Sequence, residues 1–386
     1  MLTKNIGFIN FQIKKKNKLV KKILKLILKE NSQIIQSLKT SYSNSYAKKI
    51  FKVFNKKLDY RIIGMGGSIL GAHAIYDFLN GKIRTKFHFV ENLQAKKNDH
   101  SKNFYNNLII SKSGDTVETI LNANVLIKKK DKNLFITENK NSYLYNLAKK
   151  LKAEVVEHNN FIGGRYSVLS EVGMLPAELM GLSFKKFKQL NTLVKNKNFL
   201  NNLVMNAGSI VYFLKKKKFN SIVINYDEKS TNLFNWYQQL VAESLGKKNI
   251  GLLPLVSNMP KDNHSLMQLY LDGFKNNFFT IFHVKENQPE KINSKRILRS
   301  KSYLKNKDLG KIIFSQKKAT ENIFKKRKIP FRSFEINKRD ERTLGELFTF
   351  FILETILIGR ILKINTFDQP AVELIKSETK NILIKI

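Results

Sequence analysis

One polar segment has the residue types that could hold an anionic ligand. It reads SKSGDTVET at residues 111–119 and lies where a helix is predicted to begin. Free backbone N–H groups and the positive end of the helix dipole favour a phosphate at such a position. An ordinary helix N-cap needs only one hydroxyl, so four hydroxyls and a lysine indicate a phosphate loop. The side chains concerned are Ser111, Lys112, Ser113, Thr116 and Thr119.

A second segment, GMGGS at residues 64–68, directly follows a predicted strand. Gly66 and Gly67 would let the backbone approach a ligand closely, and Ser68 could cap the helix that follows. A tight turn between a strand and a helix would explain the same residues equally well.

Two further segments could supply catalytic side chains. Arg165 follows two glycines in GGRYS at residues 163–167. It could project into a cleft, or it could form a structural salt bridge in a surface turn. Gln239 and Glu243 are four residues apart and therefore share one face of a predicted helix. Glu243 could be a general base or an ordinary helical glutamate.

The remaining candidates are scattered polar residues. The chain has 6 histidines, and no pair of them has ligand spacing on a helix, so we predict no metal site. His264 differs from the others because it lies in a polar turn, KDNHS, that begins a helix. Gln369 and Lys376 belong to FDQPAVELIK, where a turn precedes the last helix.

Short apolar runs alternate with helical patterns from residue 61 onward, which predicts parallel strands joined by helices. Loops at the carboxyl ends of such strands are the usual ligand sites, and the candidate segments fall there. We expect an N-terminal helical segment over residues 1–60, a first α/β domain over residues 61–184 and a second over residues 185–386, which includes the C-terminal helix.

The composition excludes several classes of protein. With 42% hydrophobic residues the chain can bury a core, and without cysteine it has no disulfides or thiol chemistry. The net charge of +40 could indicate a nucleic-acid partner, but only ten of the 70 basic residues are arginine. The lysines are spread along the whole chain, which favours a solvated coat over a specific nucleic-acid face. We expect no membrane span and a cytoplasmic location.

Taken together, six segments resemble motifs of the glucose-6-phosphate isomerase family, whose members have two sugar-isomerase (SIS) domains. They occur in the family's order and span almost the whole chain. The resemblance implies an α/β fold of two tandem SIS-type domains, each a parallel sheet flanked by helices. The segments are GMGGSILG at 64–71, SKSGDTVET at 111–119, GGRYSVLSEVGMLPAEL at 163–179, QLVAESLGKK at 239–248, DNHSLMQLYLDG at 262–273 and FDQPAVELIK at 367–376.

The resemblance also implies a role for each candidate residue. Glu243 matches the base that moves a proton between C2 and C1, and Arg165 matches the arginine that stabilises the enediolate. His264 and Lys376 match groups that assist ring opening. The implied substrate-binding residues are Gly66, Gly67, Ser68, Ser111, Lys112, Ser113, Thr116, Thr119, Gln239 and Gln369.

The implied activity is the interconversion of glucose 6-phosphate and fructose 6-phosphate in glycolysis and gluconeogenesis. This chemistry needs a base, a cation and a ring-opening acid, and it requires no cofactor. The resemblance further implies a homodimer in which the residue matching His264 reaches the partner's active site. An SIS protein that senses sugar phosphates without turnover is the alternative, and the presence of Glu243 argues against it.

Overall fold

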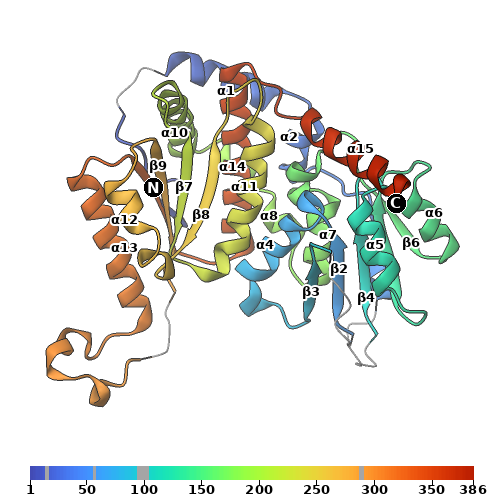
Figure 1. Cartoon of the computed structure of the whole chain (residues 1–386), viewed down its shortest axis with the longest axis horizontal. Helices are drawn as coiled ribbons and strands as arrows, with labels where there is room; N and C mark the ends of the chain where they lie inside the picture. The colour runs from blue at the N-terminus through green and yellow to red at the C-terminus, as the bar shows by residue number, and fades with distance from the viewer. Residues whose placement is uncertain (14–16, 55–57, 94–103, 287–290) are drawn as a thin grey trace.

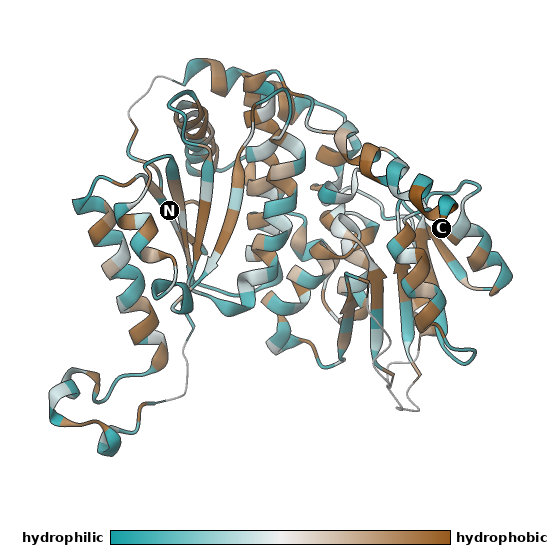
Figure 2. Ribbon diagram, in the orientation of Figure 1, coloured by the Kyte–Doolittle hydropathy of each residue, from teal (hydrophilic) through white to brown (hydrophobic). Residues whose placement is uncertain are grey.

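The computed structural model describes residues 1–13, 17–54, 58–93, 104–286 and 291–386. Their strands form two five-stranded sheets, each with helices around it (Figure 1). Apolar residues are concentrated on the strands and on the helix faces that cover them (Figure 2). The alternation of apolar runs and helices therefore produces the α/β fold that the sequence predicts.

The first sheet has the strand order β3-β2-β4-β5-β6, and all of its pairings are parallel. Its central strands are buried on both faces, as expected for a parallel sheet between helices. The strands are β2 (Tyr60–Gly64), β3 (Phe87–Val90), β4 (Asn106–Ile110), β5 (Lys132–Thr137) and β6 (Glu154–Glu157). The helices that follow them are α4 (Leu70–Phe78), α5 (Val117–Leu126), α6 (Tyr143–Lys150) and α7 (Glu171–Leu179).

The second sheet has the order β1-β10-β9-β7-β8. The pairings among β7 to β10 are parallel. The strands are β7 (Asn220–Asn225), β8 (Leu253–Asn258), β9 (Asn277–Val284) and β10 (Phe331–Ile336). The helices of this half are α8 (Phe184–Phe187), α9 (Leu190–Leu193), α10 (Lys197–Lys215), α11 (Thr231–Leu245), α12 (Met267–Asp272), α13 (Leu309–Lys326), α14 (Glu341–Leu362) and α15 (Pro370–Lys385).

The N-terminal segment contains more than the predicted helix. Strand β1 (Ile6–Ile9) pairs antiparallel with β10, so that Ile6 lies opposite Ile336 and extends the second sheet. Four residues that include a glycine are too short to show a strand period, and for this reason the sequence pattern did not reveal them. The rest of the segment forms α1 (Lys18–Lys29), α2 (Gln33–Ser37) and α3 (Ile50–Val53).

Helix α14 lies at the centre of the second half and contacts α1, α8, α10 and α11. It is buried from Thr343 to Gly359. Its Glu354 pairs with Arg332 of β10, and both side chains are almost completely excluded from solvent. Arg332 also donates to Thr280 Oγ1 and Asn206 Oδ1, at 2.9 Å each, so the buried charges have several partners. No helix within the described ranges is long and apolar enough to cross a membrane.

A buried lysine joins the N-terminal segment to the first domain. Lys188 is 2% exposed, and its Nζ donates to the carbonyl oxygens of Ser37, at 2.7 Å, and Leu169. The same ammonium lies 4.6 Å from the centre of the Tyr42 ring. Burial lowers the pKa of Lys188 to about 7, and the nearby Glu171 carboxylate opposes this shift.

Lys188 should make stability depend on pH. Below about pH 7 the folded protein must bury a protonated amine. Between this value and the ordinary lysine pKa, the unfolded chain binds the extra proton, so stability should rise with pH by up to about 1.4 kcal/mol per unit. Urea unfolding at pH 7, 8 and 9 would measure this effect against Lys188→Met. As the pH rises, the unfolding free energy of the wild type should increase relative to that of the variant. A constant difference would contradict a titrating Lys188.

Candidate active site

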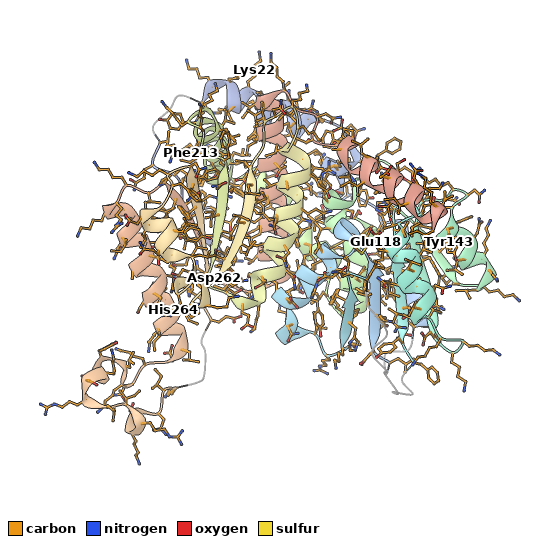
Figure 3. All side chains as sticks on the ribbon, viewed as in Figure 1. Lys22, Glu118, Tyr143, Phe213, Asp262 and His264 are labelled. Atoms are coloured by element: carbon orange, nitrogen blue, oxygen red, sulfur yellow. The ribbon has the colours of Figure 1, made fainter. Side chains whose placement is uncertain are left out.

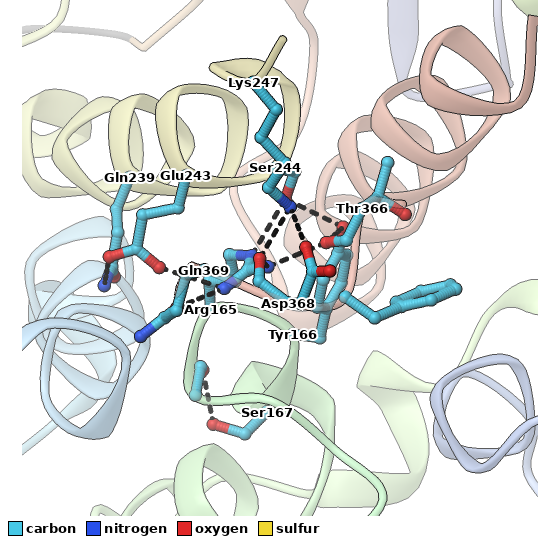
Figure 4. Close-up of polar contacts among 12 residues, drawn as sticks. Arg165, Tyr166, Ser167, Gln239, Glu243, Ser244, Lys247, Thr366, Asp368 and Gln369 are labelled. Atoms are coloured by element: carbon cyan, nitrogen blue, oxygen red, sulfur yellow. Dashed lines mark hydrogen bonds and ion pairs between the residues drawn. The ribbon is translucent and has the colours of Figure 1, made fainter. Parts of the chain in front are cut away.

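The side chain of Arg165 is the centre of a buried polar cluster between the two halves of the chain. It is 2% exposed and comes from the 3-10 helix η3 (Gly164–Leu169), which follows β6. Its Nε donates to Ser244 Oγ at 2.9 Å, and its Nη1 donates to Glu243 Oε2 at 3.1 Å and to Gln369 Oε1 at 2.5 Å (Figure 4). Predicted site residues from three separate segments therefore meet at one guanidinium group.

The other terminal nitrogen of Arg165 holds the chain before α15. Nη2 donates to the backbone oxygens of Thr366, at 2.7 Å, and Asp368, at 2.9 Å. All five guanidinium N–H groups thus have an acceptor, which is what a buried arginine requires. The Arg165 carbonyl in turn accepts a bond of 3.2 Å from the indole of Trp236.

The glycine-rich turn lies directly against Arg165. A Cβ on Gly67 would lie 2.1 Å from the carbonyl carbon of Gly164 and 2.4 Å from the Arg165 nitrogen, so only glycine fits. Gly66 has a φ of +51°, and a Cβ there would lie 2.6 Å from Gln239 Nε2. The amide of Gln239 donates to Glu243 Oε1 at 2.9 Å.

The hydroxyl-rich loop lies beside this turn. Gly64 at the end of β2 pairs with Ile110 at the end of β4, so the GMGGS turn and the loop beginning at Ser111 leave the same edge of the sheet. Ser68 is buried in that turn, within the 3-10 helix η1 (Gly66–Ser68). The arrangement brings the two predicted ligand-binding segments together.

Four of the predicted hydroxyls surround the start of α5. Ser111 Oγ lies 2.9 Å from Thr116 Oγ1 and accepts the Gly114 N–H at 3.2 Å. Ser113 is exposed and accepts the N–H of Asp115, also at 3.2 Å. Thr119 is fully buried, and its hydroxyl has no partner within the described part of the chain. The Thr116 side chain does not cap α5, which leaves the first-turn N–H groups available to an anion.

Lys112 does not join these hydroxyls in the structure. Its Nζ donates to the Asn160 carbonyl at 2.7 Å and lies 3.7 Å from Glu138 Oε1. Burial lowers the pKa of Lys112, and the Glu138 carboxylate counteracts the shift. The position of its ammonium is therefore set by partners that follow β5 and β6.

His264 and Lys376 also lie apart from Arg165. His264 is exposed next to the 3-10 helix η5 (Lys261–Asn263), beyond the end of β8. Figure 3 places it far from Glu118, which lies in the first turn of α5. Lys376 is exposed on α15 and pairs with Glu373 at 2.7 Å. Neither side chain contacts Glu243 in the part of the chain that the structure describes.

Two residues of the cluster, Ser244 and Lys247, were not predicted from the sequence patterns. Ser244 is fully buried, accepts from Arg165 and lies 2.8 Å from the Tyr166 hydroxyl. Lys247 contacts the segment before α15. Ser244 and Lys247 follow Glu243 within the QLVAESLGKK motif, and only this proximity to Glu243 could have indicated them.

No group of three or more His, Asp or Glu residues that could hold a metal occurs in the described ranges. The groups available for chemistry are a carboxylate, a guanidinium and a hydroxyl-rich loop at an uncapped helix start. A carboxylate can accept a proton, and an arginine can stabilise an oxyanion.

Comparison with known proteins gives a consistent result. A model of the family described as phosphoglucose isomerase matches residues 27–252. The chain is 33% identical over 344 residues to a glucose-6-phosphate isomerase from Methanocaldococcus jannaschii, with 84% of both chains covered. It is 34% identical to a glucose-6-phosphate isomerase from Mycoplasmopsis pulmonis, with 84% of this chain and 82% of the relative covered. The chain belongs to the phosphoglucose isomerase family.

Solved structures agree on the fold. A hypothetical protein from Thermus thermophilus has a TM-score of 0.82 at 21% identity, with 95% of this chain and 94% of that chain covered. A glucose-6-phosphate isomerase from Chlamydia trachomatis has a TM-score of 0.73 at 16% identity, with 95% and 84% covered. The predicted phosphoglucose isomerase resemblance and the fold of two SIS-type α/β domains are confirmed.

The contact between Gly67 and Arg165 leads to a structural prediction. In Gly67→Ala the added methyl group must separate the two turns, so unfolding free energy should fall by at least about 2 kcal/mol. The emission of Trp236, the only tryptophan, should also shift because its indole bonds to Arg165. Chemical unfolding and fluorescence spectra would measure both effects.

Gly81→Ala is the matched control, since a Cβ at Gly81 would meet no atom within 4 Å. It should leave both properties close to those of the wild type. Equal behaviour of the two variants would show that the close approach of Gly67 to Arg165 is not required.

Proposed function

We propose that this chain interconverts glucose 6-phosphate and fructose 6-phosphate through an open-chain enediolate. The observation that carries the proposal is the contact between Glu243 and Arg165 beside the hydroxyl-rich loop. A base and a cation lie together at the sheet edge that also has an anion-binding helix start. The relatives with this name and the family assignment support the same activity.

The loop of Ser111, Ser113, Thr116 and Thr119 is proposed to bind the phosphate of the sugar. The Thr119 hydroxyl, which has no partner among the residues that the structure describes, and the uncapped start of α5 support this role. Lys112 would have to leave the Asn160 carbonyl to join the phosphate. The phosphate lies away from the reacting carbons, so its binding energy can hold C1 and C2 against the base.

Glu243 is proposed to remove the proton from C2 of the open aldose and return it to C1. One carboxylate oxygen is held by Gln239 and the other by Arg165. This fixes the carboxylate on the substrate side of α11. Gln239 also has an amide oxygen without a partner in the described structure, which makes it available to a sugar hydroxyl alongside Gly66, Gly67 and Ser68.

Arg165 is proposed to stabilise the charge on O1 and O2 of the enediolate. Among the described residues its Nη1 bonds only to the side chains of Glu243 and Gln369, whereas its Nη2 bonds to backbone carbonyls. Side chains can move aside at lower cost than the backbone, so Nη1 is the nitrogen that can turn to the substrate. Gln369 would then be free to contact the sugar as well.

Ring opening is assigned to His264 and Lys376. Because His264 is exposed and separate from Arg165 in its own chain, we propose that it completes the site of a second copy in a homodimer. Lys376 would act from α15, the helix that Gln369 connects to Arg165. We further propose a cytoplasmic enzyme with the domain boundary at residues 184 and 185.

Removal of the base gives the first test of activity. Glu243→Gln should bind substrate but lose at least about a hundredfold in kcat, because an amide cannot accept the proton in the transition state. A coupled assay of fructose 6-phosphate conversion, with mannose 6-phosphate run alongside, would measure it.

The exposed Glu228 supplies a control, and Glu228→Gln should retain wild-type kcat. Near-normal turnover by Glu243→Gln would refute the assignment of the base. A wild-type protein that binds the sugar phosphate without turnover would instead be the sensor.

Mixed dimers test the assignment of His264. Glu243→Gln and His264→Ala homodimers should each be nearly inactive. In a heterodimer of the two variants, one shared site has both changes and the other has neither, so about half of wild-type activity should return. Purified heterodimer, isolated with two different affinity tags, is the species to assay. Absence of recovery, or a monomer in solution, would contradict the shared site.

A further inference from the structure

Lys247 holds the chain segment that leads to α15. It lies two residues beyond the end of α11, after Gly246, and its side chain is 14% exposed. Its Nζ donates to the Asn365 carbonyl at 2.5 Å and to the Asp368 carbonyl at 2.6 Å, and it lies 2.6 Å from Asp368 Oδ1. Each of the three ammonium protons therefore has its own acceptor.

The same segment carries a residue that contacts Arg165. The Asp368 carbonyl accepts from both Lys247 and Arg165, and the next residue, Gln369, contacts Arg165 through its side chain (Figure 4). Lys247 thus fixes the backbone immediately before Gln369. A hydrogen bond from Lys247 also holds the pKa of the Asp368 carboxyl below its usual range.

The other contacts of this segment also lie before α15: the Tyr166 hydroxyl donates to the Thr366 carbonyl at 3.1 Å, and the Tyr166 and Phe367 rings are 5.7 Å apart. Thr366 is the last buried residue, and every residue of α15 is exposed, including Leu374 at 73% and Ile375 at 71%. Apolar burial within the chain therefore does not determine where α15 begins. The polar contacts from Arg165, Tyr166 and Lys247 determine this position, and among them only Lys247 and Arg165 bond to Asp368, the residue directly before Gln369.

We infer that Lys247 is a positioning residue for the isomerase reaction, which holds Gln369 against Arg165 without contacting the sugar. This inference rests on the proposed function. A neutral side chain could not replace the two hydrogen bonds to carbonyl oxygens and the ion pair with Asp368. Arginine could retain part of this role because it keeps the charge and can donate to both carbonyls.

Kinetics of Lys247→Met, Lys247→Arg and Lys248→Met test the inference. Lys248 is the adjacent exposed lysine and serves as the control. Lys247→Met should lower kcat about tenfold with less than about threefold change in KM, because the site is misaligned and not removed. Lys247→Arg should recover a large part of kcat, and Lys248→Met should match the wild type.

A double variant separates positioning from general stability. In a Gln369→Ala background the residue being positioned is already absent, so adding Lys247→Met should lower kcat by less than about twofold more. Independent, multiplicative losses would overturn the inference. So would a wild-type kcat for Lys247→Met, or an equal loss in Lys248→Met.

Hydrogen exchange provides a readout that does not require activity. Amides of residues 365–376 should exchange several-fold faster in Lys247→Met than in wild type or Lys248→Met. Unchanged exchange would overturn the positioning role even if kcat fell. The wild type could also lack isomerase activity while Lys247→Met still exchanges faster. That result would reject the proposed function but support the role of Lys247 in holding the segment before α15.

Discussion

The structure of the site depends on the burial of one guanidinium group. A charge removed from water must have its donors satisfied, and Arg165 has five N–H groups to satisfy. Their acceptors come from α11 and from the segment before α15. Once Arg165 is buried, these distant parts of the sequence can occupy only a narrow range of positions around it.

The glycines of the neighbouring turn make this burial possible. Gly67 allows the turn after β2 to touch the backbone of Arg165, and the pairing of β2 with β4 places the hydroxyl-rich loop next to that turn. The register of the sheet and the absence of a side chain at Gly67 thus fix the position of the hydroxyl-rich loop relative to Glu243. The second half contributes through α11, which is held by the buried helix α14.

Much of this arrangement could be predicted because it follows from local patterns. Parallel strands present their carboxyl ends at one edge, so loops with glycines and hydroxyls after β2 and β4 had to be neighbours. No local pattern indicated the contacts of Lys112, because Asn160 and Glu138 are distant in the sequence and approach its ammonium group only in the folded chain. His264 is exposed and its proposed role requires a second chain, so neither the sequence pattern nor a single folded chain tests it. Ser244 and Lys247 resemble ordinary helix-end residues until their partners near residue 366 are known.

The antiparallel strand β1 has a consequence for how the protein is made. Ile6 is synthesised long before its partner Ile336, because almost the whole of both sheets lies between them in the sequence. The first sheet can assemble while β1 is still unpaired, because β1 can pair only after β10 has been synthesised. During translation the β1 segment therefore remains an unpaired apolar strand, which is open to pairing with other chains until β10 has been made.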